Sequence, residues 1–277
     1  MNARLHQRRL LASTTLLVAI GLLALGIQRM APVIRSLTFL TGWLLLAVML
    51  VLTGYNFFKK LSVLPLGSSR FWLQFHVYSG WFSVALFVAH LRARWPTGWF
   101  EGLLTTFFVL TTMSGAAGLA WSRLVPRRLT ARGGEVLFER IPVIRRELAD
   151  RAEKLALAST TASGSPVLAE FHARHLAGFL RGPRHFWRHL IGSRRPMNQM
   201  RARFADLGRF LDPSQRKALA ELEELVRQKD TLDYHHAQQS SLKLWLFTHI
   251  PLTYGTLLLT VLHVVLVYGF AAGSATH

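Results

Sequence analysis

The chain has 277 residues, of which 51% are hydrophobic, and its 33 Lys and Arg residues outnumber its 14 Asp and Glu residues. A soluble domain does not need so much apolar sequence, and a disordered basic protein could not carry it, so the composition predicts an integral membrane protein. The chain has no Cys, which excludes disulfides, thiolate-bound zinc, cysteine-bound iron–sulfur clusters and covalent haem attachment through Cys-x-x-Cys-His.

Five segments are apolar over the roughly 20 residues needed to cross a bilayer. In chain order they cover residues 10–28, 37–58, 71–91, 98–121 and 244–270. The first follows a basic start, as a signal peptide would, but its long apolar run has no small-x-small cleavage site, so we interpret it as an uncleaved anchor. The expected parts are an anchor span over 1–36, three core spans over 37–122, an insert over 123–243, and a fifth span with the C-terminus over 244–277.

Basic residues near the ends of the spans predict the orientation, because positive charge collects on the cytoplasmic side of a membrane. With the N-terminus inside, thirteen such residues are cytoplasmic and four are outside. The thirteen are Arg4, Arg8, Arg9, Lys59, Lys60, Arg70, Arg123, Arg127, Arg128, Arg132, Arg227, Lys229 and Lys243; the four are Arg29, Arg35, Arg92 and Arg94. We therefore expect an inner (plasma) membrane protein with its N-terminus and long insert in the cytoplasm and its C-terminus outside.

The insert over residues 123–243 carries 23 basic and 13 acidic residues and is too polar to cross a bilayer. Apolar residues recur at helical spacing over 134–157 and 213–232, which predicts amphipathic helices. The small and polar residues of 159–166 are typical of a linker, and Gly182-Pro183 and Arg195-Pro196 are expected to break helices.

Four histidines lie within the predicted spans, where ionisable side chains are costly and usually functional. His76 and His90 are on the third span, His249 and His263 are on the fifth, and each pair is 14 residues apart. Fourteen residues turn a helix by about 1400°, within about 40° of four turns, and rise about 21 Å, so both members of a pair share one face. The third and fifth spans run in the same direction, so His76 faces His249 and His90 faces His263. Each facing pair could supply both axial ligands of a haem iron.

The alternatives are histidines that only bond to neighbouring backbone or hydroxyl groups, and a transition-metal channel or proton relay. Neighbouring residues suit the haem hypothesis, since glycines let helix backbones approach a flat ligand and basic residues pair with propionates. Ordinary helix packing would explain the glycines equally well, and positive-inside anchoring would explain the basic residues on the inner side. The residues in question are Gly42, Gly54, Gly80, Gly102, Gly115 and Gly118, with Arg70 and Lys243 on the inner side and Arg92 and Arg94 on the outer side.

The pattern His76-x13-His90 on one span and His249-x13-His263 on the next but one resembles the haem-binding helices of membrane di-haem cytochromes b. It is similar to the four-helix core of respiratory cytochrome b and to the transmembrane domain of ferric reductases and NADPH oxidases. The resemblance covers about half of the chain and implies two b-type haems with these four histidines as iron ligands. The basic insert has no counterpart in the quinol-oxidising core, and no flavin- or nicotinamide-binding domain follows the fifth span.

Six further histidines lie in the insert, namely His172, His175, His185, His189, His235 and His236. Pairs at i,i+3 and i,i+4 could bind zinc or a third haem, with Glu170 or Asp233 as possible partners. Their Arg- and aromatic-rich surroundings are more typical of an interfacial helix on anionic lipid, and a protein-docking surface is a third reading. Nucleic acid is not expected as a partner of a membrane-tethered insert.

The expected fold is all-α: an integral membrane bundle of five spans with a haem-binding four-helix core and a long cytoplasmic helical insert. The expected function is electron transfer across the bilayer by a cytochrome b subunit of an oxidoreductase complex. We expect this subunit to be non-catalytic, because Glu101 is the only acidic residue among the predicted spans. The expected partners are membrane lipid, soluble or membrane redox subunits, and a quinone or quinol as a candidate bound ligand. A histidine-lined metal or proton transporter and a membrane anchor for a redox complex are the rival hypotheses.

Overall fold

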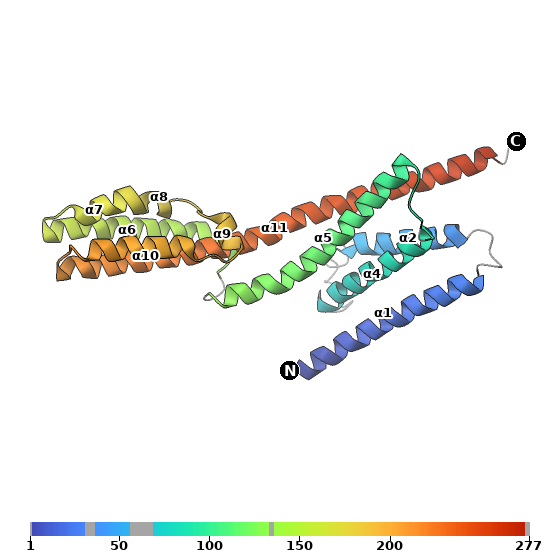
Figure 1. The fold of residues 1–277 in the computed structure, drawn as a ribbon, viewed down its shortest axis with the longest axis horizontal. Helices are drawn as coiled ribbons and strands as arrows, with labels where there is room; N and C mark the ends of the chain where they lie inside the picture. Colours follow the sequence, from blue (N-terminus) through green and yellow to red (C-terminus); the bar gives the residue numbers. More distant parts are fainter. Residues whose placement is uncertain (1, 31–36, 56–68, 93, 133–135, 275–277) are drawn as a thin grey trace. The chain divides into compact units, whose positions relative to one another are not determined.

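The computed structural model describes residues 2–30, 37–55, 69–92, 94–132 and 136–274 (Figure 1). Over these ranges the chain forms helices and short connections and contains no strand, which confirms the all-α class. The chain divides into two compact units: Met1–Ala116 with Thr248–His277, and Ala117–Phe247. The second unit corresponds closely to the insert expected over 123–243.

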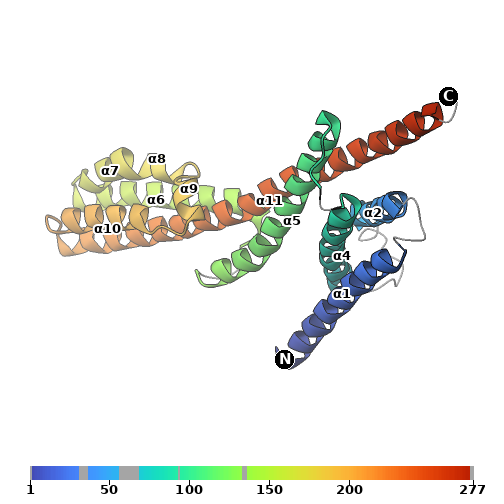
Figure 2. The same cartoon turned by 45° about the vertical axis from the view of Figure 1, so that its right-hand side comes forward.

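The first unit is built from α1 (Asn2–Met30), α2 (Leu37–Thr53), α4 (Ser69–His90), the first half of α5 (Trp99–Thr130) and the last part of α11 (Pro213–Ser274). α4 packs against both α1 and α2 (Figure 2). Among the described residues, three helices are long and apolar enough to cross a membrane: Leu10–Arg29, Trp99–Thr130 and Pro213–Gly269. These three include the first, fourth and fifth spans expected from sequence. The second expected span corresponds to α2, a shorter apolar helix of 17 residues, and the third to α4, which is not among the three, so the number of five spans stays a prediction.

The apolar core of the first unit joins four helices. Leu45 and Met49 of α2, Leu86 of α4 and Phe108 of α5 are buried together. The Phe87 and Phe108 rings stack with their centroids 4.1 Å apart. Two polar contacts tie α11 into the same bundle. They are the bond from Trp43 Nε1 to Tyr268 Oη at 3.1 Å and the hydroxyl pair of Thr111 and Thr256 at 2.8 Å.

The second unit is a small helical bundle around the N-terminal part of α11 (Figure 1). Its other helices are η2 (Phe138–Arg140), α6 (Ile141–Ser163), α7 (Val167–Phe171), η3 (His172–Leu176), α8 (Ala177–Leu180), α9 (Phe186–Leu190) and α10 (Arg195–Gly208).

Local sequence signals set several helix ends in this unit. Asp212 accepts hydrogen bonds at its Oδ1 from the Gln215 N–H and the Ser214 hydroxyl, both at 2.8 Å, so it caps α11 just before Pro213. Gly164, at φ 69°, terminates α6 in the left-handed conformation that glycine adopts without strain. α6 therefore continues to Ser163, which makes the expected linker over 159–166 too long. Pro196 lies in the first turn of α10, where proline is tolerated, so Arg195-Pro196 starts a helix and does not only break one.

Apolar residues from α6, α7, η3, α8, α10 and α11 form one core in this unit. Its fully buried members include Ile141, Leu168, Leu176, Leu222 and Val226. The expected amphipathic helices over 134–157 and 213–232 supply two of its sides, and their apolar stripes face each other across this core.

Replacing Leu222, whose side chain is 0% exposed, by alanine is expected to lower the free energy of unfolding by about 2–5 kcal/mol, since the cavity left behind cannot fully collapse. The measurement is thermal unfolding of the detergent-purified protein followed by circular dichroism. Leu157→Ala is the control, because Leu157 is 58% exposed on α6. Equal melting temperatures for the two variants would contradict the assignment of this core.

Candidate functional site

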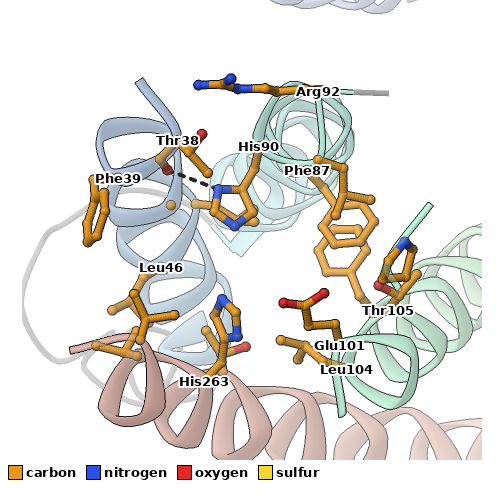
Figure 3. A pocket seen from close by; sticks show the side chains of 18 of the residues that line it. Thr38, Phe39, Leu46, Phe87, His90, Arg92, Glu101, Leu104, Thr105 and His263 are labelled. Atoms are coloured by element: carbon orange, nitrogen blue, oxygen red, sulfur yellow. Dashed lines mark hydrogen bonds between the residues drawn. The ribbon is translucent and has the colours of Figure 1, made fainter. Parts of the chain in front are cut away.

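A cavity of about 640 Å³ lies within the first unit and is lined by side chains from α2, α4, α5 and α11. Cofactor pockets in proteins usually have volumes of about 300–1,000 Å³. Its lining is mainly apolar and aromatic, and includes Trp43, Phe87, Phe108 and Tyr268. His90 of α4 and His263 of α11 point into this cavity toward each other (Figure 3).

The two imidazoles are placed as a pair of axial ligands would be. Their ring centroids are 6.4 Å apart and their planes are at 87°. Imidazole–metal bonds are about 2 Å long, so two rings bound in line to one metal ion have centroids about 6 Å apart. The observed separation therefore has the right size for a metal ion between His90 and His263, which the 14-residue spacings predicted to face each other.

The His90 ring is held in one orientation by helix α2. Its Nδ1 lies 3.1 Å from the backbone carbonyl oxygen of Thr38 and 3.4 Å from the Thr41 hydroxyl. A carbonyl oxygen only accepts, so Nδ1 carries the proton and donates it to Thr38. Nε2 then keeps its lone pair, which is the arrangement that metal-ligating histidines usually show.

Gly42 gives the His90 ring room against α2. A Cβ atom at position 42 would lie 3.0 Å from Cε1 and 3.3 Å from Nδ1 of His90. A larger residue would therefore push the ring away from Thr38. On α5, a Cβ at Gly115 would lie 3.4 Å from Cε1 of His249, so a glycine also adjoins a histidine of the inner pair.

The second expected pair is His76 on α4 and His249 on α11, the two helices that also carry His90 and His263. The His76 ring packs on Tyr55, with centroids 4.9 Å apart. Its Nδ1 is buried and has no hydrogen-bond partner among the residues that the structure describes. The structure places His90 and His263 on one cavity, and the pairing of His76 with His249 stays a prediction.

The basic residues expected at the haem propionates have different surroundings. Arg92 and Arg94 line the outer cavity, and Arg92 lies at its rim (Figure 3). Arg92 has φ 50°, a left-handed conformation that costs a non-glycine residue about 1 kcal/mol. Lys243 already has partners in the second unit, since its Nζ lies 3.6 Å from Glu139 Oε1 and 3.6 Å from the Phe138 ring centroid.

The remaining predicted glycines are less informative. Added Cβ atoms at Gly80 and Gly102 would meet nothing within 4 Å. Gly118 adjoins the indole ring of Trp245, which occupies the space that its missing side chain leaves. Gly54 ends α2 through a bond from its N–H to the Leu50 carbonyl. Several basic residues used for the orientation lie outside the described residues or side chains, namely Arg4, Arg8, Arg9, Arg35, Lys59, Lys60 and Arg70.

Glu101 lines the same outer cavity as His90 and His263, from the first turn of α5 (Figure 3). The sequence singled it out as the only acid among the spans but gave no reason to place it beside the histidines. Thr38 was missed altogether, because its contribution is a backbone carbonyl, which no sequence pattern reveals.

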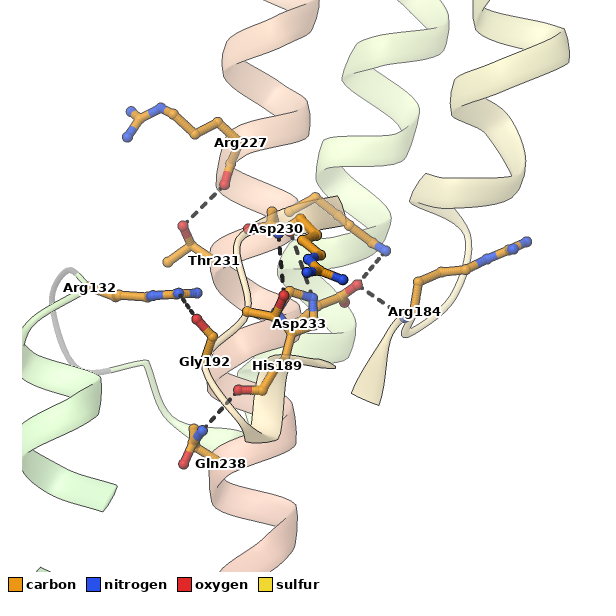
Figure 4. Close-up of polar contacts among 12 residues, drawn as sticks. Arg132, Arg184, His189, Gly192, Arg227, Asp230, Thr231, Asp233 and Gln238 are labelled. Carbon is orange, nitrogen blue, oxygen red and sulfur yellow. Dashed lines mark hydrogen bonds and ion pairs between the residues drawn. The ribbon is translucent and has the colours of Figure 1, made fainter. Parts of the chain in front are cut away.

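A second concentration of buried polar groups lies in the second unit, centred on Asp233 of α11 (Figure 4). Lys229 Nζ lies 2.6 Å and Arg145 Nη2 lies 3.5 Å from the carboxylate oxygens of Asp233. The Arg184 backbone N–H donates to the same carboxylate at 3.0 Å. Lys229 is 0% exposed and its ammonium group lies 3.8 Å from the centroid of the Phe179 ring. Asp233 is therefore a structural anion with several donors around it.

His189 of α9 is also fully buried, with Nε2 3.6 Å from Asp230 Oδ1. Burial lowers the pKa of His189 to about 4, and burial raises the pKa of Asp230. Of the other insert histidines, His236 stacks on Phe138 and His175 contacts Phe171. No group of three or more His, Asp or Glu side chains in the described part of the chain is placed to hold a metal ion, so the expected zinc possibility gains no support.

In comparisons with known proteins, no family model, no characterised protein and no solved structure matches this chain.

The stability of the protein is expected to fall as the pH is lowered from 7 to 5. His189 has a folded pKa of about 4 against about 6.5 when unfolded, so between these values the unfolded state binds more protons and the stabilisation present above pH 6.5 is lost on acidification. The expected loss from this residue is about 2 kcal/mol. The raised pKa of Asp230 acts in the opposite sense, because its extra proton is bound in the folded state.

His189→Leu is expected to flatten this pH dependence when melting temperatures of the detergent-purified protein are compared at pH 7 and pH 5. Trp187→Leu, a change at an exposed and non-titrating neighbour on α9, is expected to keep the wild-type slope. Parallel slopes for wild type and His189→Leu would rule out His189 as a source of the pH dependence.

Proposed function

We propose that this protein is a membrane electron carrier that holds two b-type haems, one between His90 and His263 and one between His76 and His249. It crosses the membrane five times, with the fourth helix α5 returning between the two ligand-bearing helices α4 and α11. The N-terminus and the second unit lie in the cytoplasm of a cell whose inner (plasma) membrane holds the protein, and the C-terminus lies outside. Three apolar helices of membrane-crossing length support the membrane location.

The observation that carries the proposal is the pairing of His90 and His263 on one cavity of about 640 Å³ with their ring centroids 6.4 Å apart. Two histidines are sufficient ligands for haem iron, because the porphyrin supplies the other four nitrogens. When bound, haem supplies reversible one-electron chemistry that the side chains of this chain lack.

The residues of the chain have separate roles around this group. Thr38 keeps the proton on Nδ1 of His90 and directs Nε2 toward the cavity. The apolar and aromatic side chains of the cavity exclude water. Arg92 and Arg94, at its outer end, are placed to pair with carboxylate groups of a bound ligand.

The two sites are related by the 14-residue spacing on each ligand helix, which corresponds to about 21 Å along the membrane normal. A carrier with sites at both depths connects electron donors on one face with acceptors on the other. We propose a membrane quinone or quinol and soluble or membrane redox subunits as its exchange partners, with the chain as the electron-carrying subunit of an oxidoreductase complex. The membrane-anchor hypothesis differs in needing no haem.

A proton pathway is the second candidate function, and the position of Glu101 favours it. A carboxyl group on the same cavity as two imidazoles provides three proton-binding groups within one membrane helix bundle. A transporter built in this way would fold and work without haem, so cofactor content separates the two proposals.

The protein purified in detergent is expected to contain about two b-type haems per chain, measured as pyridine haemochrome, with a low-spin spectrum after dithionite reduction. His263→Ala is expected to retain about one, because His76 and His249 are untouched. Leu258→Ala on the same helix is the matched control and is expected to retain both, because Leu258 is 71% exposed and does not line the cavity. A folded, haem-free wild-type protein would reject the proposal and leave the proton-transport and anchor hypotheses.

Gly42→Val is expected to lower the occupancy of the outer site selectively, because its side chain would displace the His90 ring from Thr38. The readout is the haem content of the variant and its reduced spectrum, compared with those of His263→Ala. Gly21→Val on α1 is the control, since a Cβ there meets nothing within 4 Å. Full haem content in Gly42→Val would show that the close approach of α2 to His90 is not needed.

A further inference from the structure

Residues 184–195, here called the basic segment, form an exposed surface of unusual composition in the second unit. Trp187 and Ile191 are 72% and 79% exposed, although both are large and apolar. The side chains of Arg184, Arg188, Arg194 and Arg195 are exposed around them, and no acidic residue occurs in the segment. Such a combination of exposed apolar and basic side chains is costly in water and needs a partner that is both apolar and anionic.

The basic segment is held in place by polar contacts on its other side. Gln238 Nε2 donates to the carbonyls of His189 and Leu190 at 3.0 and 3.1 Å. Arg128 Nη1 donates to the Leu190 carbonyl at 3.2 Å, and Arg132 Nη2 donates to Gly192 at 3.1 Å. Within the segment the side chain of His189 is fully buried, and the side chain of Arg184 points away from the Asp233 cluster (Figure 4). One face is thereby fixed to α5 and α11, and the apolar and basic face stays outward.

The anchoring residues place this surface near the membrane boundary. Arg128 and Gln238 belong to α5 and α11, two of the three helices long and apolar enough to cross a membrane. These helices are joined by a bond from Trp121 Nε1 to Ser241 Oγ at 2.6 Å, and tryptophan N–H groups of this kind are typical of the membrane interface. Arg128 follows Trp121 by seven residues, about 10 Å of helix. The basic segment therefore lies about one headgroup layer from the level of Trp121.

We propose that the basic segment docks on the anionic lipid headgroups of the membrane in which the protein itself resides. Trp187 and Ile191 enter the headgroup layer, and the four arginines contact lipid phosphates. Charge complementarity and the proximity of the two crossing helices both favour lipid over a soluble protein as the occupant. The proposal rests on the membrane location within the proposed function but not on haem binding.

The chain contains no cysteine, so a single introduced cysteine can be labelled without altering any other position. The test uses full-length Ile191→Cys carrying an environment-sensitive fluorophore, in nanodiscs of phosphatidylcholine alone or of phosphatidylcholine with phosphatidylglycerol. Quenching by lipids with a nitroxide near the headgroup reports contact with the membrane. Leu157→Cys is the matched control, because Leu157 is 58% exposed on α6. Residue 157 belongs to the C-terminal part of α6, which leads into α7. The helix α7 lies at the end of the second unit away from α9 (Figure 1).

The expected result is a blue shift and strong quenching at position 191 that require phosphatidylglycerol, with little quenching at position 157. Adding Arg184→Gln and Arg188→Gln to Ile191→Cys should lower the ratio of docked to undocked protein roughly 25-fold, about fivefold for each basic residue near an anionic surface. Arg184→Gln leaves the backbone N–H that binds Asp233 unchanged. High salt should have a similar effect.

Equal quenching at 191 and 157, or quenching at 191 that is the same in both lipid mixtures, would overturn the proposal. A blue shift of the fluorophore that already occurs in nanodiscs of phosphatidylcholine alone would indicate that position 191 contacts a protein surface. This result would also overturn the proposal. The haem content of the same samples is measured in parallel and is expected to be unchanged by the arginine substitutions. A failure of lipid docking is therefore distinguishable from a failure of the electron-carrier proposal.

Discussion

The hydrogen bond from His90 Nδ1 to the Thr38 carbonyl, at 3.1 Å, is the interaction on which the candidate site depends. It satisfies a partly buried polar group of an ionisable side chain and fixes the position of its proton, which leaves the lone pair on Nε2. The bond also joins α4 to α2, so ligand orientation and helix packing are achieved by the same contact. Because Thr41 Oγ1 donates to the carbonyls of Leu37 and Thr38 in the same turn, the first turn of α2 is held firmly beneath the imidazole.

In the second unit, buried charged side chains are stabilised by contacts with one another. Lys229 and Asp233 are both almost completely buried, which would be strongly destabilising for either charge alone. Their contact at 2.6 Å, the additional donors from Arg145 and Arg184, and the Phe179 ring over the ammonium group distribute the charge over four elements. The cluster therefore fixes where α6, α8 and the start of the basic segment meet α11. The outward face of that segment follows from this inner arrangement.

Much of the fold was predictable from sequence because its signals are periodic and local. Apolar runs predicted five spans, three of which correspond to described helices of membrane-crossing length. The helix expected to start at Pro213 does start there, whereas the one expected over 134–157 continues to Ser163. The facing of His90 and His263 followed from 14-residue spacing, since four helical turns return a side chain to nearly the same face. The Lys229–Asp233 pair has the i,i+4 spacing of an ordinary surface ion pair, so only three-dimensional packing reveals that it is buried. For the same reason the sequence could not place Glu101 on the cavity or assign Thr38 a role.

The four helices of the core contribute different residues to the candidate site. α4 and α11 carry the histidines, whereas α2 and α5 carry glycines that adjoin one histidine of each pair: Gly42 next to His90 and Gly115 next to His249. A helix that offers no side chain at these points lets an imidazole lie against its backbone, so its carbonyls or its surface can orient the ring. Glycine in a helix interior lowers the stability of the helix by about 1 kcal/mol relative to alanine. At Gly42 and Gly115 the missing side chain allows a close contact between the helix and an imidazole ring. The two helices without histidines thus determine where the histidines of the other two can point.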